Sequence, residues 1–427
     1  MDYSKIIFIF LLLGLAIIAQ SFVNHGGSFS KQKVLEVENK LRHLRRHSLK
    51  TIKSEDGDII DCIDLNKQPA FDHPALKNHK IQMAPTKNSA KKEPIEWTKS
   101  RSKTKDAEDS LSLRVLTSQI WKKSGTCPEG TIPIRRIRKN DMLKAPSIEE
   151  YGRKKPSFSP SRQVHENLDS YVPLRNHSKA ILFAVGFRYL GAKADINVCW
   201  PFVEKDDEFS TAQISLLTGS YIHFESVQSG WAVNPRVYGD RQTRVFVYWT
   251  ADGSNKTGCF DLTCPGFVQT SKEIALGAAI YPIIPVPGDL PYDINIYIYK
   301  DILTNNWWVQ YGEKTNIGYW PAELFETLCY NADSVEWGGE VYSSKILHYP
   351  HTKTNMGNGK FGSQPYSAYF KRMRIHDNSE SLKFPEYVDR YSDEYNCYDV
   401  RFLGDYVEDP ELYYGGPGSS DYNYMCL

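Results

Sequence analysis

Asp293-Ile-Asn-Ile-Tyr-Ile-Tyr299 alternates isoleucine with polar or aromatic residues, as expected of a β-strand whose two faces meet different surroundings. Short apolar runs of the same kind occur upstream, at 180–186, 212–217 and 244–249. Turn-forming residues such as Asp252-Gly253 lie between such runs. Many short strands separated by turns predict one all-β domain over residues 178–427, an antiparallel sandwich or barrel. In this half we expect one helix, from Pro321 to Leu328, with proline in its first turn.

The N-terminal region has a different pattern. Residues 33–50 place apolar residues at helical spacing among charged ones, which predicts a surface helix. The segment from Asp56 to Met83 is rich in proline, aspartate and histidine, and we interpret it as docked extended chain rather than a set of metal ligands. Residues 84–112 carry few apolar residues, which predicts a disordered segment. Residues 127–136 predict a strand that completes a small mixed module.

The first 21 residues have the pattern of a secretory signal peptide. Lys5 precedes an apolar run from Ile6 to Ala19, and small residues follow at the expected cleavage position. The run is shorter than the roughly 20 apolar residues of a membrane helix, although an uncleaved anchor is the alternative. We therefore expect a secreted protein, extracellular or in the cell wall, with the vacuole as another destination and no membrane association after cleavage.

Eight cysteines, an even number in a chain expected to be secreted, predict disulfides before a metal site. The sequence contains no Cys-x-x-Cys pair, and we interpret His348 and His351 as loop residues. The favoured disulfides are Cys62 with Cys127, Cys259 with Cys264, and Cys397 with Cys426. The remaining two cysteines, Cys199 and Cys329, either pair or stay as thiols. Spacing leaves the connectivity open, and we expect no metal and no other cofactor.

Charge and composition restrict the partners. The chain has 52 Lys and Arg residues against 51 Asp and Glu residues, so neither a nucleic acid nor an anionic membrane is expected to bind. Aromatic residues make up 13% of the chain and concentrate after residue 180, which suits pleated surfaces and grooves for peptides or sugars. Two sequons, at Asn176 and Asn255, are candidate glycosylation sites.

Two short clusters that combine glycine, tryptophan and an acidic residue point to a family. The first is Glu225-Ser-Val-Gln228-Ser-Gly-Trp231-Ala-Val-Asn-Pro235, and the second is Val335-Glu-Trp-Gly-Gly-Glu340-Val341. They resemble the two catalytic segments of the neprosin family, plant secreted glutamic peptidases that cleave after proline. Further segments share this resemblance: Tyr238-Gly-Asp240, 246–252, 257–259, 264–269, 292–294, Lys300-Asp301, Trp307-Trp308 and 318–321. Residues 56–83 resemble the activation segment that precedes the catalytic domain in that family.

The resemblance implies a zymogen in two parts. It places an activation or propeptide-like region at 22–155, a linker at 156–177 and a β-sandwich of the neprosin type at 178–427. The expected partners are a proline-containing peptide or protein substrate and the chain's own propeptide as an intramolecular inhibitor. The basic run Arg153-Lys-Lys155 is either close to the processing site or part of a solvated linker, because exposed polar linkers attract proteases.

In that family each segment carries one catalytic glutamate, and this chain departs from the pattern. Glu340 stands at the second position and can act as the general base, whereas Gln228 stands at the first and cannot exchange protons. The Gln228 amide can still polarise a carbonyl or hold an oxyanion, and the fungal glutamic peptidases use such a Gln/Glu pair. Glu225 is an alternate carboxylate, but its position three residues earlier on a strand predicts the opposite face. Gly338 and Gly339 are expected to leave room for a substrate backbone.

Aromatic residues offer a groove that could grip proline rings, although for each of them a place in the core is the more common alternative. The candidates are Trp231, Trp249, Trp307, Trp308, Tyr319 and Trp320. The leading hypothesis is therefore a secreted neprosin-like glutamic endopeptidase, weakened or re-tuned at Gln228. The alternative is a non-catalytic β-sandwich that binds proline-rich cell-wall peptides or glycans, or a decoy that sequesters such peptides.

Overall fold

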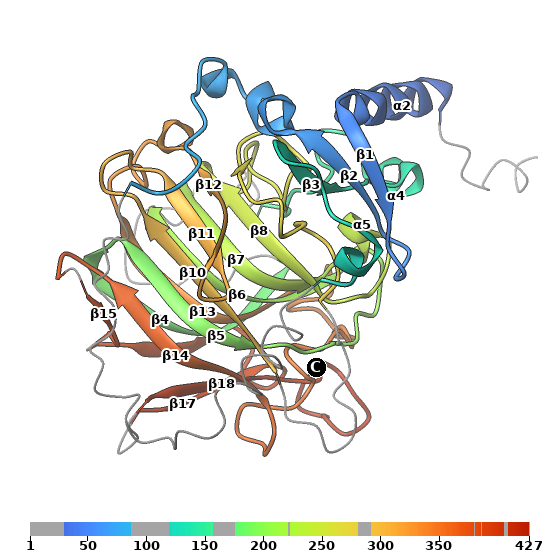
Figure 1. The fold of residues 1–427 in the computed structure, drawn as a ribbon. Helices are drawn as coiled ribbons and strands as arrows, with labels where there is room; N and C mark the ends of the chain where they lie inside the picture. The colour runs from blue at the N-terminus through green and yellow to red at the C-terminus, as the bar shows by residue number, and fades with distance from the viewer. Residues whose placement is uncertain are drawn as a thin grey trace, which may run out of the picture.

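The computed structural model describes residues 30–86, 119–156, 176–220, 223–280, 292–379, 381–385, 387–404 and 409–426. Two large antiparallel sheets face each other, and a small module at the N-terminus, blue in Figure 1, covers one end of them. The predicted signal peptide lies outside the described residues, as do most of the segment predicted to be disordered and most of the predicted linker. Within the described ranges, no helix is long and apolar enough to cross a membrane.

One sheet of the sandwich has six strands among the described residues, and every pairing in it is antiparallel. Its strands, in spatial order, are β16 (Asp389–Ser392), β4 (His177–Tyr189), β13 (Ala332–Tyr342), β6 (Phe209–Gly219), β7 (Phe224–Val233) and β8 (Arg244–Thr250). The two sequence clusters that carry the resemblance lie on β7 and β13. Strand β6 separates them, so segments about a hundred residues apart in the chain become near neighbours.

The second sheet has nine strands in the described part of the chain. Its main path is β17 (Asp399–Leu403), β18 (Glu411–Gly415), β14 (Ala368–His376), β5 (Gly191–Asn197), β10 (Asp293–Lys300), β11 (Trp307–Tyr311), β12 (Thr315–Trp320) and β9 (Val268–Gln269). The short β15 (Leu382–Lys383) pairs with β14 off this path. The predicted all-β antiparallel sandwich is therefore confirmed.

The core forms between the sheets because side chains alternate along each strand. On β13, Val335, Trp337 and Val341 are fully buried and belong to the large core cluster that includes both sheets. Burying a large apolar side chain contributes roughly 1.5–3 kcal/mol. The even-numbered residues of β13, Glu336 and Glu340, lie on the opposite face of the same strand. The six-stranded sheet therefore has one apolar face and one polar face.

The N-terminal module is a three-stranded sheet with short helices. Its elements are α2 (Lys31–Arg45), β1 (Ser48–Lys53), β2 (Ile59–Asp64), 3-10 turns at Leu65–Lys67, Pro69–Asp72, Pro74–Leu76 and Ile120–Ser124, β3 (Thr131–Arg135) and α4 (Lys139–Lys144). The helix predicted at 33–50 is shorter, because its last residues form β1 and pair with β2. That pairing buries Ile52 beside Trp121 and the Cys62–Cys127 disulfide.

A buried ion cluster joins this module to the sandwich. Asp58 of the module accepts hydrogen bonds from Arg135 Nε at 2.9 Å and from Arg244 Nη1, on β8, at 2.6 Å. Arg244 also donates to Asp240 at 2.6 Å, next to the short helix α5 (Pro235–Tyr238). Burial would raise the pKa of Asp58, but the Arg244 and Arg135 guanidinium groups hold that pKa below its usual range. The docked module therefore favours an ionised Asp58.

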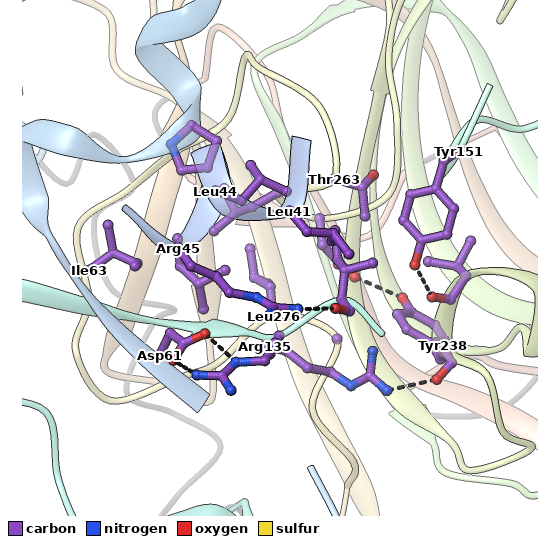
Figure 2. Close-up of a pocket in the computed structure, with 18 residues that line it drawn as sticks. Leu41, Leu44, Arg45, Asp61, Ile63, Arg135, Tyr151, Tyr238, Thr263 and Leu276 are labelled. Carbon is purple, nitrogen blue, oxygen red and sulfur yellow. Dashed lines mark hydrogen bonds and ion pairs between the residues drawn. The ribbon is translucent and has the colours of Figure 1, made fainter. Parts of the chain in front are cut away.

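A cavity of about 50 Å³ lies at the same junction (Figure 2), lined by α2, β3 and parts of the sandwich. Arg135 donates to the backbone oxygen of Tyr238 at 2.7 Å, and the Tyr238 hydroxyl donates to Asp261 at 2.9 Å. Burial raises the pKa of the Asp261 carboxyl to about 7. Neither Glu340 nor Gln228 lines this cavity. It belongs to the surface on which the module docks.

The helix predicted from Pro321 to Leu328 is wrong, because only a 3-10 turn at Ala322–Leu324 forms there. Glu225, buried at the start of β7, explains the difference. Its carboxylate accepts the backbone N–H groups of Glu326 at 2.7 Å, Thr327 at 2.9 Å and Leu328 at 2.6 Å. These three amides donate to the Glu225 side chain on β7, whereas in the predicted helix they would donate to backbone carbonyls of the preceding turn.

We predict that Glu225→Ala lowers the free energy of unfolding by about 3 kcal/mol or more, because three amides and the Thr327 hydroxyl lose their acceptor. Urea denaturation at pH 7 measures the change. Glu326→Ala is the matched control, since it removes an exposed carboxylate from the same loop and leaves the backbone donors in place. Equal stability of the two variants would contradict the assignment.

Candidate active site

Glu340 and Gln228 lie on the polar face of the six-stranded sheet. Glu340 on β13 is opposite Thr211 of β6, and Gln228 on β7 is opposite Ser215 of the same strand. Both side chains are almost fully buried, with relative exposures of 3% and 5%. Between them, Gln213 of β6 donates from Nε2 to Glu340 Oε2 at 3.1 Å. The register thus brings the two predicted site residues to one place.

The two side chains converge on the ammonium group of Lys154. Lys154 Nζ donates to Glu340 Oε2 at 2.6 Å and to Gln228 Oε1 at 2.8 Å. Lys154 comes from residues 145–156, which we call the strap because they cross from α4 of the N-terminal module onto the sandwich. Its side chain is 5% exposed. The basic run that the sequence placed near processing or in a solvated linker therefore carries a buried residue at the centre of the site.

Two hydrogen bonds to the sandwich hold the strap in place. The Tyr151 hydroxyl donates to the backbone oxygen of Val237 at 2.6 Å, and the Phe260 N–H donates to Gly152 O at 2.7 Å. Gly152 has φ +81°, and a Cβ there would lie 2.0 Å from the Thr263 hydroxyl. Only glycine fits this crossing without strain. The strap therefore reaches Lys154 with its path fixed.

His177 is a site residue that the sequence analysis missed. Its Nδ1 lies 2.6 Å from Glu340 Oε1, and its Nε2 lies 3.1 Å from the backbone oxygen of Lys155. Both partners are acceptors, so both contacts are hydrogen bonds when the ring carries two protons. The ring is buried against Tyr342 and Phe209. It lies at the end of the predicted linker 156–177, where nothing marked it as a site residue.

Electrostatics favour an ionised Glu340. Burial would raise the pKa of its carboxyl, but the Lys154 ammonium and the His177 ring hold that pKa well below its usual range, with a contribution from Lys179. Burial lowers the pKa of Lys154, against the opposing charge of Glu340. Lys179 itself pairs with Glu336 at 2.8 Å on the same face. The centre therefore holds one carboxylate among several donors.

Several expected roles change in the structure. Glu225 lies on the face opposite Gln228 and binds the 326–328 loop, so it does not join the site. Gly338 and Gly339 leave no room for substrate: a Cβ on the first would lie 2.3 Å from Ala180 O, and one on the second 2.6 Å from the Met356 side chain. These glycines allow close packing of the strand against its neighbours.

The predicted aromatic groove is wrong for this structure, because all six side chains are at most 2% exposed and belong to the core cluster. They are Trp231, Trp249, Trp307, Trp308, Tyr319 and Trp320. The strand alternation explains Trp231, since it lies on the apolar face of β7, next to Gly230. The Tyr319 hydroxyl accepts the Gln82 N–H at 3.0 Å and lies 2.8 Å from His79 Nε2. The segment 56–83 therefore covers this side chain.

The cysteines form the three favoured pairs. Disulfides join Cys62 to Cys127, Cys259 to Cys264, and Cys397 to Cys426, while Cys199 and Cys329 are free thiols. Among the described residues, His351 lies within 4.8 Å of the sulfurs of the last pair. Those sulfurs are bonded to each other, so the group offers no thiolate. Of the two sequon asparagines, Asn255 is exposed and Asn176 is half-buried at the start of β4.

We predict that Lys154→Met lowers the free energy of unfolding at pH 7 by about 3 kcal/mol, because it removes the cation from a buried carboxylate. A lowered folded-state pKa gives stability that is present above the unfolded pKa and lost as pH falls below it. The deficit should therefore shrink below about pH 4. Urea titrations at pH 7 and pH 3 measure it. Lys155→Met is the matched control, because the Lys155 ammonium lies over the Tyr342 ring rather than on Glu340. An equal stability deficit of Lys154→Met at both pH values would refute the pairing of Lys154 with Glu340.

Fold and site together define an antiparallel β-sandwich whose polar face holds a buried carboxylate and carboxamide beneath a strap from an N-terminal module. Two family models match the sequence of this chain. Residues 206–417 match Neprosin, and residues 51–183 match the Neprosin activation peptide. The chain belongs to the neprosin family. This membership supports a peptidase with an intramolecular propeptide.

Solved structures of related fold were also found. Scytalido-glutamic peptidase, solved with a peptide-based transition state analog, is 12% identical, with 56% of this chain and 98% of that chain covered and a TM-score of 0.31. SCP-B, a member of the Eqolisin family of peptidases solved with the tripeptide Ala-Ile-His, is 11% identical, with 57% and 98% covered and a TM-score of 0.29.

Proposed function

We propose that the chain is the zymogen of a secreted glutamic endopeptidase that cleaves after proline, with Glu340 as general base and Gln228 as its partner. One observation carries the proposal. Glu340 and Gln228 hold a single atom, Lys154 Nζ, between them at 2.6 and 2.8 Å. Side chains that converge on one ammonium nitrogen can equally converge on a water and a substrate carbonyl once the ammonium leaves. Family membership supports the same reaction class.

The proposed reaction needs no group beyond the described side chains. Glu340 takes a proton from water, whose oxygen bonds to the carbonyl carbon of the substrate. The carbonyl oxygen takes the negative charge, and the Gln228 amide, turned about its last torsion, donates a hydrogen bond to it. The C–N bond then breaks, and the proton on Glu340 passes to the leaving nitrogen.

His177 supplies a second donor in this scheme. Its Nε2 already faces a peptide carbonyl, that of Lys155, at 3.1 Å, while Nδ1 stays on Glu340. A substrate carbonyl in the same place would receive an N–H from a ring that Glu340 orients. This contact compensates for the proton that Gln228 cannot supply.

The strap supports a role for the propeptide as inhibitor. Lys154 occupies the space between the two proposed catalytic side chains and neutralises the base. Because Glu340 and Asp58 both have lowered pKa values in the docked form, docking of the module weakens as pH falls through those values. We therefore propose activity at acid pH after processing. We also propose glycosylation at the exposed Asn255 and at Asn176.

Peptide hydrolysis tests the proposal. Processed protein is incubated from pH 2 to 7 with peptides that contain one proline, and the products are read by mass spectrometry. We predict cleavage after proline and a loss of about a thousandfold in kcat for Glu340→Gln, because the base is gone. Glu336→Gln, on the same face of β13, is the matched control and should keep most of the activity. No cleavage by wild type at any pH refutes the proposal.

Gln228→Glu tests the partner role. If Gln228 is a working donor, the variant should change kcat by less than about tenfold, since one donor is exchanged for another. It should also add a second titrating carboxyl to the pH–rate profile. A gain of more than a hundredfold would instead show that the first position has decayed.

The inability of Gln228 to transfer a proton favours a second candidate function. In this alternative the sandwich binds proline-rich cell-wall peptides or glycans without cleaving them. Saturable binding that Glu340→Gln leaves unchanged, together with no hydrolysis, would favour it.

A further inference from the structure

The Lys154 ammonium is enclosed by more than its two polar partners. Its nitrogen lies 5.0 Å from the centre of the Tyr248 ring, 5.6 Å from that of Phe209 and 5.8 Å from that of Phe260. These are cation–π distances. The rings also pack on one another, with Phe260 at 5.1 Å from Tyr248 and 6.0 Å from Phe209. We call these three rings the aromatic cage.

Every group around the ammonium belongs to the sandwich and not to the strap. Phe209 is on β6, Tyr248 on β8 and Phe260 on the loop closed by the Cys259–Cys264 disulfide. Glu340 and Gln228 come from β13 and β7. The Tyr248 hydroxyl is engaged with Ser254 at 2.7 Å, which fixes the ring. Removal of the Lys154 side chain would therefore leave the receiving pocket in place.

The chemistry of this pocket suits a primary ammonium group. Two oxygens, Glu340 Oε2 and Gln228 Oε1, accept N–H groups, so a quaternary ammonium could not satisfy them. The cage stabilises positive charge where water is excluded. A neutral alcohol offers one donor and leaves the buried carboxylate without a counter-charge. A slim alkyl chain is needed, because Lys154 enters through its methylene groups.

We infer that the centre of the sandwich, once Lys154 is absent, is a binding site for primary alkylammonium groups, either a lysine side chain of a peptide or a free alkylamine. The inference rests on the proposed function only for its consequence: such groups would compete with substrate in the processed enzyme. Binding itself is independent of catalysis. The site therefore gives the mature protein sensitivity to lysyl peptides and amines.

Full-length Lys154→Ala tests the inference without any assay of activity. The variant lacks the three terminal methylenes and the nitrogen, which n-propylammonium supplies. We expect n-propylammonium to raise the melting temperature of the variant by about 2–4 °C, with half-saturation on the order of 1 mM. Wild type, whose site is filled, is the matched control and should not shift. n-Propanol and tetramethylammonium should have no effect on the variant.

Further variants locate the site. Adding Tyr248→Leu to Lys154→Ala should raise the half-saturation concentration about fivefold or more, and adding Glu340→Gln tenfold or more. A shift of the same size in wild type, or an equal effect of n-propanol, overturns the inference. If Lys154→Ala does not fold, Lys154→Met serves in the reverse experiment: n-propylammonium should then have no effect, because methionine fills the pocket, and a shift would overturn the inference.

Inhibition assays on the processed enzyme distinguish the two sources of the ammonium group, a lysine side chain and a free amine. A short peptide with lysine should inhibit competitively at least tenfold more strongly than its norleucine counterpart, and n-propylammonium should inhibit at its own binding concentration. Inhibition by the amine alone assigns the site to free amines. If wild type has no activity, the proposed function fails while the melting-temperature result still decides the inference.

Discussion

The ammonium of Lys154 lies between Glu340 and Gln228, and all three residues are at most 5% exposed. A charge buried this deeply costs several kcal/mol unless it is paired and hydrogen-bonded, so each partner constrains the other. The Lys154 ammonium offsets the free-energy cost of burying the Glu340 carboxylate. The carboxylate in turn offsets the cost of burying the ammonium. The polar face of the sheet supplies both partners of this contact, and the strap supplies Lys154. Its removal would leave a carboxylate, a carboxamide and an imidazole facing an aromatic cage.

One sheet carries both the core and this site because the side chains along each strand alternate between its two faces. Odd-numbered residues of β13, such as Trp337, pack against the second sheet, and even-numbered residues, such as Glu340, face the strap. The same rule separates Gln228 from Glu225 on β7. Although both are buried polar residues, Glu225 binds three backbone amides of a loop and contributes stability, whereas Gln228 meets Lys154. Position on the pleat decides which of the two can meet Glu340.

Much of this was predictable from local pattern. The alternation in residues 293–299 indicated strands, and the two clusters indicated Glu340 and Gln228. The helix expected at 321–328 failed because Glu225, about a hundred residues away, binds its amides, and propensity cannot report such a partner. The tryptophans were assigned to a groove because composition does not tell which face of a strand meets the second sheet. His177 and Lys154 were missed as site residues because only register and the path of the strap bring them to Glu340.

The balance of charge around Lys154 gives a physical reason for glutamine, rather than glutamate, at position 228. With glutamine at this position, one ammonium from the strap neutralises one carboxylate, and His177 adds a further donor to that carboxylate. A glutamate at 228 would put a second negative charge within reach of the same Lys154 nitrogen, and close carboxylates resist ionising together. One of them would then keep a proton while the strap is docked. Gln228 avoids this titration, so the docked form holds a single ionised carboxylate, Glu340, at this place over the pH range in which Lys154 stays charged.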